Sequence, residues 1–193
     1  MSDLSKDKLE ILRQSVMDAP VILKGEYHYF IHPLSDGVPS QSAELLEAAR
    51  DLIHERVDWS SVDIILGIEA MGIPLAASLC LATGKPMVIG RKRQYGLPGE
   101  TAINQSTGYS KGSIYLNDIG QGDRVFIVDD VISTGGTLLP ILKSIDGIGA
   151  TVADCWIVFE KGDGMDFVRS NGDWPLNSLV RISMDGSRVT LLV

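Results

Sequence analysis

Two adjacent carboxylates, Asp129 and Asp130, stand close before a segment of hydroxyl residues and glycines. An apolar run that ends at Val128 precedes them, and a helix-forming pattern follows. The segment consists of Ser133, Thr134, Gly135, Gly136 and Thr137. A glycine-rich turn before a helix exposes backbone N–H groups, and the helix dipole adds positive potential, so the turn suits a phosphate monoester. Carboxylates accept hydrogen bonds from sugar hydroxyls or hold Mg²⁺ directly or through water. Together they predict a sugar-phosphate site.

The plain alternative is an aspartate cap and an ordinary glycine turn. A lone Thr-Gly-Gly would favour that alternative, but the whole string after a clear strand favours the phosphate site. The string is not a Walker A loop, because no Gly-Lys-Ser/Thr follows, and it lacks the glycine spacing of a dinucleotide-binding turn.

A formal net charge of −8 argues against a nucleic-acid-binding surface, which needs a basic stripe. The same charge means that any phosphate site must be locally positive through N–H groups, a few cations or a metal ion. Arg91, Lys92 and Arg93 follow a strand and precede a long polar segment, where they can neutralise an anionic substrate. The alternative is a solvated charge run.

With 193 residues, 45% of them hydrophobic, the chain is expected to fold as a single domain with a full core. No apolar run is long enough to cross a bilayer, and the first residues lack the order of a secretory signal, so we expect a cytoplasmic protein with no membrane partner. Cys80 and Cys155 are expected to be buried, reduced thiols.

The elements around the site alternate. Apolar spacing predicts a helix over 4–18 and another over 45–53, capped by Ser42. From residue 62 onward, strands alternate with helices, which indicates a parallel sheet covered on both faces. The expected strands are 62–68, 87–89, 113–116, 124–128 and 151–159, and the expected helices are 73–82 and 136–145.

Two further segments stand out. Residues 91–112 are polar and glycine-punctuated, and so long a loop is expected to be functional or mobile. Asp185-Gly186 lies between two β-rich runs, 179–184 and 187–193, and predicts a C-terminal hairpin.

The string VDDVISTGGT resembles the phosphoribosyl diphosphate loop of the type I phosphoribosyltransferases. HPL, EAMGIP, RKRQYGL and TGYSKG extend the resemblance over roughly residues 20–160, with the archaeal-type hypoxanthine phosphoribosyltransferases as the nearest subfamily. The resemblance implies an α/β fold with a mostly parallel central sheet. It places N-terminal helices and a base hood at 1–60, the core at 62–160 and a C-terminal hairpin at 176–193.

The resemblance also implies roles for single residues. Ser133 to Thr137 would hold the 5′-phosphate of phosphoribosyl diphosphate (PRPP), and Asp129 and Asp130 the ribose hydroxyls and Mg²⁺. The diphosphate would contact Ala70, Met71, Gly72, Arg91, Lys92 and Arg93, with Arg91 also counted as catalytic. The purine would lie against Tyr29, Phe30 and Phe159, although an aromatic run is more often core. Family members pair as homodimers, which is expected here by analogy.

Two departures from the adenine-specific relatives leave undecided which base is used and which residue donates a proton. Adenine-specific relatives carry an arginine at the position of Met71 and a glutamate where Gly108 precedes Tyr109. Glu100 is a candidate substitute for that acid. The main hypothesis is a salvage enzyme that acts on hypoxanthine, and on guanine as a second base. The alternatives are an adenine phosphoribosyltransferase and a non-catalytic regulator that senses PRPP.

Overall fold

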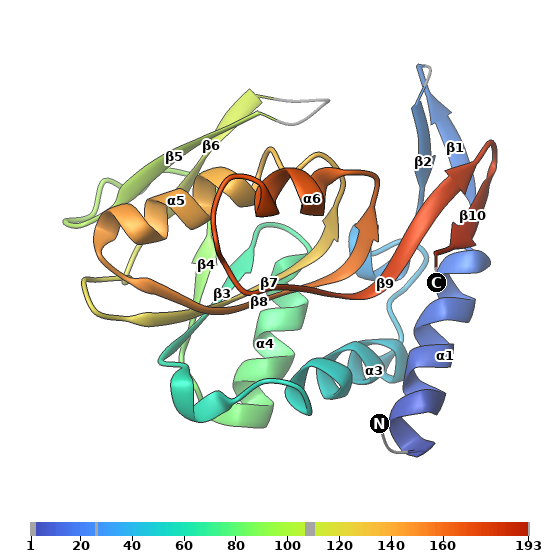
Figure 1. The fold of residues 1–193 in the computed structure, drawn as a ribbon, viewed down its shortest axis with the longest axis horizontal. Helices are drawn as coiled ribbons and strands as arrows, with labels where there is room; N and C mark the ends of the chain where they lie inside the picture. The colour runs from blue at the N-terminus through green and yellow to red at the C-terminus, as the bar shows by residue number, and fades with distance from the viewer. Residues whose placement is uncertain (1–2, 26, 107–110, 193) are drawn as a thin grey trace.

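The computed structural model describes residues 3–25, 27–106 and 111–192. Its central feature is a six-stranded sheet (Figure 1). The strands are β3 (Ile64–Ile68), β4 (Met87–Gly90), β7 (Arg124–Ile132), β8 (Thr151–Lys161), β9 (Leu176–Asp185) and β10 (Arg188–Leu191). Their order is β10-β9-β8-β7-β3-β4, and all neighbours run parallel except β9 and β10, which form the C-terminal hairpin. The predicted, mostly parallel sheet is therefore confirmed.

Helices cover both faces of this sheet, as Figure 1 shows. One face packs against α1 (Asp3–Met17), α3 (Ala43–His54) and α4 (Gly72–Thr83). The other face packs against α5 (Leu138–Ile148) and α6 (Gly164–Arg169). The apolar residues divide into one cluster on each side, because each strand sends alternate side chains to opposite faces.

Two smaller hairpins project from the core. One joins β1 (Val21–Lys24) to β2 (Tyr27–Phe30), and the other joins β5 (Thr101–Ser106) to β6 (Lys111–Leu116). Between the first hairpin and α3 lies a single helical turn, α2 (Pro33–Asp36), and the 3₁₀ turn Trp59–Ser61 precedes β3. The first hairpin and α2 lie within residues 1–60, where a base hood is expected, and that role stays a prediction.

Sequence patterns located most of these elements. The cap at Ser42 is confirmed, since its Oγ accepts a hydrogen bond from the backbone N of Leu45 at 3.1 Å. Three expectations are corrected. The strand expected to end at Val128 continues to Ile132, because it keeps pairing with β8. The segment 91–112, expected to be a loop, contains β5 and the start of β6, and the sequence patterns predicted none of β1, β2, α2 and α6.

Among the described residues, no helix is both long enough and apolar enough to cross a membrane. The division of the chain into one domain with three parts stays a prediction.

Candidate active site

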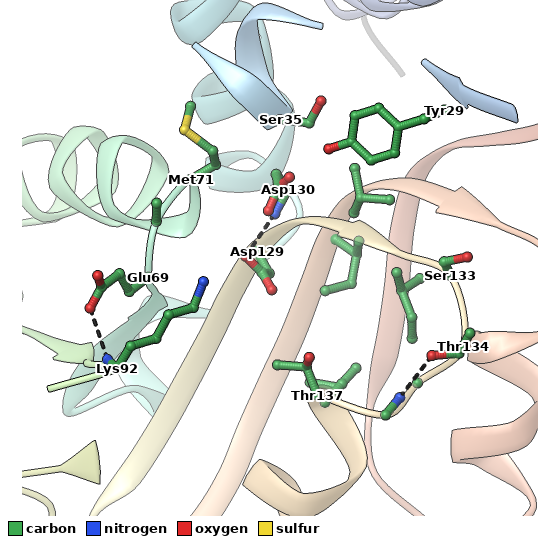
Figure 2. Close-up of a pocket in the computed structure, with 17 residues that line it drawn as sticks. Tyr29, Ser35, Glu69, Met71, Lys92, Asp129, Asp130, Ser133, Thr134 and Thr137 are labelled. Atoms are coloured by element: carbon green, nitrogen blue, oxygen red, sulfur yellow. Dashed lines mark hydrogen bonds between the residues drawn. The ribbon is translucent and has the colours of Figure 1, made fainter. Parts of the chain in front are cut away.

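The carboxyl ends of β3 and β7 meet at one edge of the sheet. The two strands pair in parallel, with Leu66 opposite Ile127 and Gly67 opposite Val128. The turn after β3 and the last residues of β7 therefore face each other across a cavity of about 370 Å³ (Figure 2). The lining residues are Tyr29, Ser35, Glu69, Ala70, Met71, Lys92, Asp129 to Leu138, and Ile157. Ligands of open α/β sheets bind at such an edge.

Asp129 and Asp130 form the floor of this cavity. The backbone N of Asp130 donates a hydrogen bond to Oδ1 of Asp129 at 3.0 Å. Desolvation raises the pKa of Asp129 to about 6, opposed in part by the hydrogen bonds from Asp130 and the charge of Lys92. Desolvation and the neighbouring Asp129 charge raise the pKa of Asp130 as well. The pair therefore favours a ligand that brings hydrogen-bond donors or positive charge.

Gly72 allows this placement of the carboxylates. A Cβ at position 72 would lie 2.8 Å from the carbonyl oxygen of Val128 and 3.1 Å from Oδ1 of Asp129. Any larger residue would push the start of α4 away from the end of β7. The predicted role of Gly72 in contacting diphosphate stays a prediction, and its observed contact is with the carboxylate strand.

The segment 133–137, called the phosphate loop below, forms the wall next to the floor. Gly135 has φ 75°, a left-handed conformation that favours glycine. The backbone N of Gly136 donates to Oγ1 of Thr134 at 3.3 Å, and the N of Leu139 donates to the carbonyl of Gly135 at 3.0 Å. The loop lines the cavity and leads into α5, and a glycine-rich turn before the N-terminus of a helix suits an anion.

Of the three consecutive cations, the structure brings one to the cavity. Lys92 lines it and extends toward Asp129, while its backbone N donates to Oε2 of Glu69 at 2.8 Å (Figure 2). Arg91 is ion-paired with Glu69, with 3.1 Å between Nε and Oε2, and Arg93 lies over the ring of Tyr95. Arg91 and Arg93 are not among the lining residues, so the roles predicted for them stay predictions.

A smaller cavity of about 120 Å³ adjoins the first, and the two share Tyr29, Ser35, Asp130, Val131 and Ser133. Phe30 and Lys161 complete its lining. Lys161 is buried; its Nζ donates to the carbonyl of His28 at 3.0 Å and lies 5.9 Å from the centre of the Phe30 ring. This cavity is aromatic on one side and cationic on another, which suits a flat heterocycle with an acceptor atom.

The expected base-pocket residues divide between cavity and core. Tyr29 and Phe30 line the smaller cavity, whereas Phe159 is fully buried. Its ring meets Phe30 edge-on at 6.0 Å and His32 at 4.8 Å. The expectation that Phe159 stacks on a base is therefore corrected: Phe159 supports Phe30 from the core.

The sequence patterns did not single out Lys161 as a site residue. Lys161 and its neighbour Glu160 end β8, and both are buried. Glu160 faces the opposite side of β8, where Ser178 and Arg181 donate to its carboxylate. The sequence signal for this arrangement was the charged pair Glu160-Lys161 at the end of an apolar strand. A charged side chain that is buried there must have a partner.

The proton donor also stays open. Glu100 accepts hydrogen bonds from the backbone N atoms of Tyr95 and Gly96, so it organises its own turn and does not line the cavity. Gly108 and Tyr109 lie outside the described residues.

Within the described part of the chain, no three His, Cys, Asp or Glu side chains are grouped to hold a metal ion. A pair of adjacent carboxylates beside a phosphate site nevertheless fits Mg²⁺, which binds through one or two carboxylates, waters and substrate phosphates.

The fold and the site together define an α/β protein with a cavity at the carboxyl edge of its sheet, lined by two adjacent carboxylates and a glycine-rich loop. The chain belongs to the family described as "Phosphoribosyl transferase domain", whose pattern matches residues 41–177.

Relatives are similar over nearly the whole chain. The hypoxanthine/guanine phosphoribosyltransferase of Methanothrix thermoacetophila is 50% identical over 182 residues, covering 94% of each chain. The protein of the same name from Ferroglobus placidus is 50% identical and covers 94% of this chain and 97% of its own.

Among solved structures, adenine phosphoribosyltransferase from Rhodothermus marinus is 25% identical, with a TM-score of 0.73 over 91% of this chain and 99% of its own. The adenine enzyme of Saccharomyces cerevisiae, in complex with an imino-altritol bisphosphate and adenine, is 23% identical. It has a TM-score of 0.72 over 90% of this chain and 99% of its own, and it shows a common fold.

Proposed function

We propose that this chain is a purine-salvage enzyme that transfers the phosphoribosyl group from PRPP to hypoxanthine and guanine, releasing diphosphate. The observation that carries the proposal is the joined pair of cavities. A phosphate loop and two half-buried carboxylates line the larger cavity, and an aromatic pair with a buried lysine lines the smaller. The names of the archaeal relatives support the same reaction.

The larger cavity suits the sugar phosphate. The amides and hydroxyls of the phosphate loop would bind the 5′-phosphate, and Asp129 and Asp130 would accept hydrogen bonds from the ribose hydroxyls. Ala70 and Met71 line the side toward Lys92, so their backbone and that cation would receive the diphosphate.

The chemistry asked of these residues is mainly positioning. Displacement at the sugar C1 passes through a transition state with oxocarbenium character, as in glycoside cleavage. The carboxylates near the ribose stabilise developing positive charge, and Lys92 stabilises the departing anion. Holding the base and the sugar in line removes the entropic cost of their encounter.

Asp129 and Asp130 would hold Mg²⁺, directly or through water. When bound, the ion supplies positive charge that stabilises the diphosphate as it leaves. It would also favour the ionised carboxylates against the desolvation that raises their pKa values.

Lys161 favours an oxopurine over adenine. Hypoxanthine and guanine present a carbonyl acceptor at C6, whereas adenine presents an amino donor there. A buried ammonium at the cavity is matched by the acceptor and mismatched by the donor, and mismatched polar groups discriminate strongly.

A purine panel tests the function. The enzyme, PRPP and Mg²⁺ are incubated with hypoxanthine, guanine, xanthine or adenine, and nucleotide formation is followed by chromatography. We expect IMP and GMP to form faster than AMP. If no purine is converted, the enzymatic proposal fails; if adenine is preferred, the specificity proposal fails.

The variant Lys161→Gln tests whether the charge of Lys161 selects the base. Glutamine retains a donor for the His28 carbonyl but loses the charge. The expected effect is a loss of about 10- to 100-fold in kcat/KM for hypoxanthine, the range for a charged hydrogen bond, with a smaller change for adenine. An equal loss for both bases would show that Lys161 does not select the base.

We further propose, from the family resemblance, that the enzyme acts as a cytoplasmic homodimer. Sedimentation of the purified chain tests the dimer, and a monomer at enzymatic concentrations contradicts it.

A further inference from the structure

The phosphate loop is in backbone contact with a segment that sequence patterns did not single out. This segment, residues 162–168, consists of the turn after β8 and most of α6, and is called the brace segment below. A Cβ at Gly164 would lie 2.5 Å from the carbonyl oxygen of Ser133 and 2.7 Å from the backbone N of Gly135. Real Cβ atoms do not approach backbone so closely, so the two segments pack here with no side chain between them.

The contact is reciprocal. A Cβ at Gly135 would lie 2.9 Å from the carbonyl oxygen of Gly164 and 2.8 Å from Cγ2 of Val168. The ring of Phe167 flanks the same position at 3.1 Å. The left-handed turn of the phosphate loop is therefore supported from behind by the brace segment.

The brace segment is itself fixed to the core. Met165 and Val168 are fully buried, and the backbone N of Phe167 donates to the carbonyl of Asp163 at 2.8 Å. Just after the segment, Arg169 donates to the carbonyl of Leu176 on β9 at 3.2 Å. At its other end the segment continues directly from Lys161, which lines the smaller cavity. The brace segment therefore links the phosphate loop, which lines the larger cavity, to Lys161, which lines the smaller cavity.

We propose that Gly164 is a positioning residue for the 5′-phosphate: its missing side chain lets the brace segment hold the amides of the phosphate loop in their binding geometry. The inference rests on the proposed function insofar as it assigns the phosphate to this loop. Binding groups must be held within about 0.5 Å of the productive geometry, so a displacement of a few tenths of an ångström already weakens binding.

The test compares Gly164→Ala with Gly147→Ala. Gly147 lies in α5, which the phosphate loop leads into, and its Cβ position is open space, so the control makes the same chemical change without a clash. Binding of ribose 5-phosphate is measured by calorimetry, and KM values for PRPP and hypoxanthine are measured where turnover occurs. We expect Gly164→Ala to weaken ribose 5-phosphate about 10-fold or more and to raise KM for PRPP more than KM for hypoxanthine. Gly147→Ala should match the wild type.

Phe167→Ala provides a second variant that does not depend on tolerating a clash. Its side chain is 48% exposed, so its loss should leave folding intact, while removing one flank of Gly135 should weaken ribose 5-phosphate a few-fold. If Gly164→Ala does not fold, Phe167→Ala alone tests whether the brace segment positions the phosphate loop. The proposal is overturned if a folded Gly164→Ala, judged by circular dichroism, binds ribose 5-phosphate as the wild type does, or if Phe167→Ala alone can be tested and binds normally.

The two proposals can fail separately. A wild-type chain that binds ribose 5-phosphate but converts no purine would end the proposed function, and the variants would still test the brace segment. A wild-type chain that does not bind ribose 5-phosphate would overturn the role of Gly164 directly.

Discussion

At the scale of single residues, the site is defined by carboxylates whose charged form is destabilised by desolvation. Asp129 and Asp130 lie together in a desolvated floor, where burial raises the pKa of both carboxyls and the charge of Asp129 raises that of Asp130 further. Proteins keep such pairs where a ligand relieves them, which makes strongly shifted carboxylates in a cavity candidates for function. Here the relieving groups would be ribose hydroxyls and Mg²⁺.

Replacing both carboxylates with amides tests this account. Asp129→Asn with Asp130→Asn retains shape but removes the negative charge that would hold the ribose and Mg²⁺. We expect turnover of hypoxanthine to fall by about 100-fold or more, with thermal stability equal to or above that of the wild type because a desolvated charge pair is gone. Turnover close to that of the wild type would show that these carboxylates do not bind the ribose.

His32 gives a pH-dependent prediction outside the site. Burial lowers its pKa from 6.5 to about 4, although the charge of Asp36 opposes the shift. Its Nδ1 accepts a hydrogen bond from the backbone N of Leu34 at 3.1 Å, and its Nε2 lies 3.0 Å from Oγ of Ser15. The ring therefore fits as a neutral imidazole, with Nε2 assigned as the donor.

The unfolded chain binds a proton at His32 more readily than the folded chain does. Stability from this group is therefore complete above pH 6.5 and is lost as pH falls toward 4, by an amount on the order of 3 kcal/mol. Urea unfolding of wild type and His32→Gln should show a difference in unfolding free energy that shrinks across this window. A difference that stays constant from pH 7 to pH 4 would contradict the shift.

At the scale of elements, the carboxyl ends of β3 and β7 place the site, and the helices stabilise it from either side. Helix α3 packs against α1 and α4 on the face away from α5, and its start depends on Ser42. Ser42→Ala should lower the free energy of unfolding by about 1 kcal/mol, the usual cost of losing such a cap. We expect kcat/KM to remain unchanged, and a large loss of activity without a loss of stability would place α3 in the catalytic machinery.

The length and polarity of each element explain which helices and strands could be predicted from the sequence. Long periodic segments such as α1, α3, β7 and β8 were located because apolar spacing reflects burial on one or both faces. Strand β5 was missed because its sequence TAINQS is largely polar and pairs only with β6 in a two-stranded ribbon. Helix α6 has six residues, too few for a helical period to show.

Single side-chain directions were harder to predict. The motif placed Asp129, Asp130 and the phosphate loop at the cavity, because chain order alone fixes a strand, a turn and a helix. The motif did not indicate that Lys92, and neither Arg91 nor Arg93, lines the larger cavity. It also did not indicate that Lys161, and not Phe159, lines the smaller one. Those distinctions depend on which neighbour each side chain meets, such as Glu69 for Arg91 and Phe30 for Phe159, and these contacts are remote in the sequence.

At the scale of the whole molecule, an acidic chain binds an anionic substrate by concentrating donors at one edge of its sheet. With a net charge of −8, long-range attraction does not bring PRPP to the protein. The proposed binding groups all act at short range: backbone amides of the phosphate loop, Lys92, and a cation carried with the substrate. In the proposed complex, the segment from β1 to α2 would cover the purine beside Lys161.

A crystal structure of the chain with IMP tests the central claim most directly, because one ligand spans both cavities. The account predicts the phosphate against the backbone amides of the phosphate loop, the ribose hydroxyls at Asp129 and Asp130, and the base between Tyr29, Phe30 and Lys161. IMP bound elsewhere with this loop empty, or bound with its ribose turned away from the two aspartates, would contradict it.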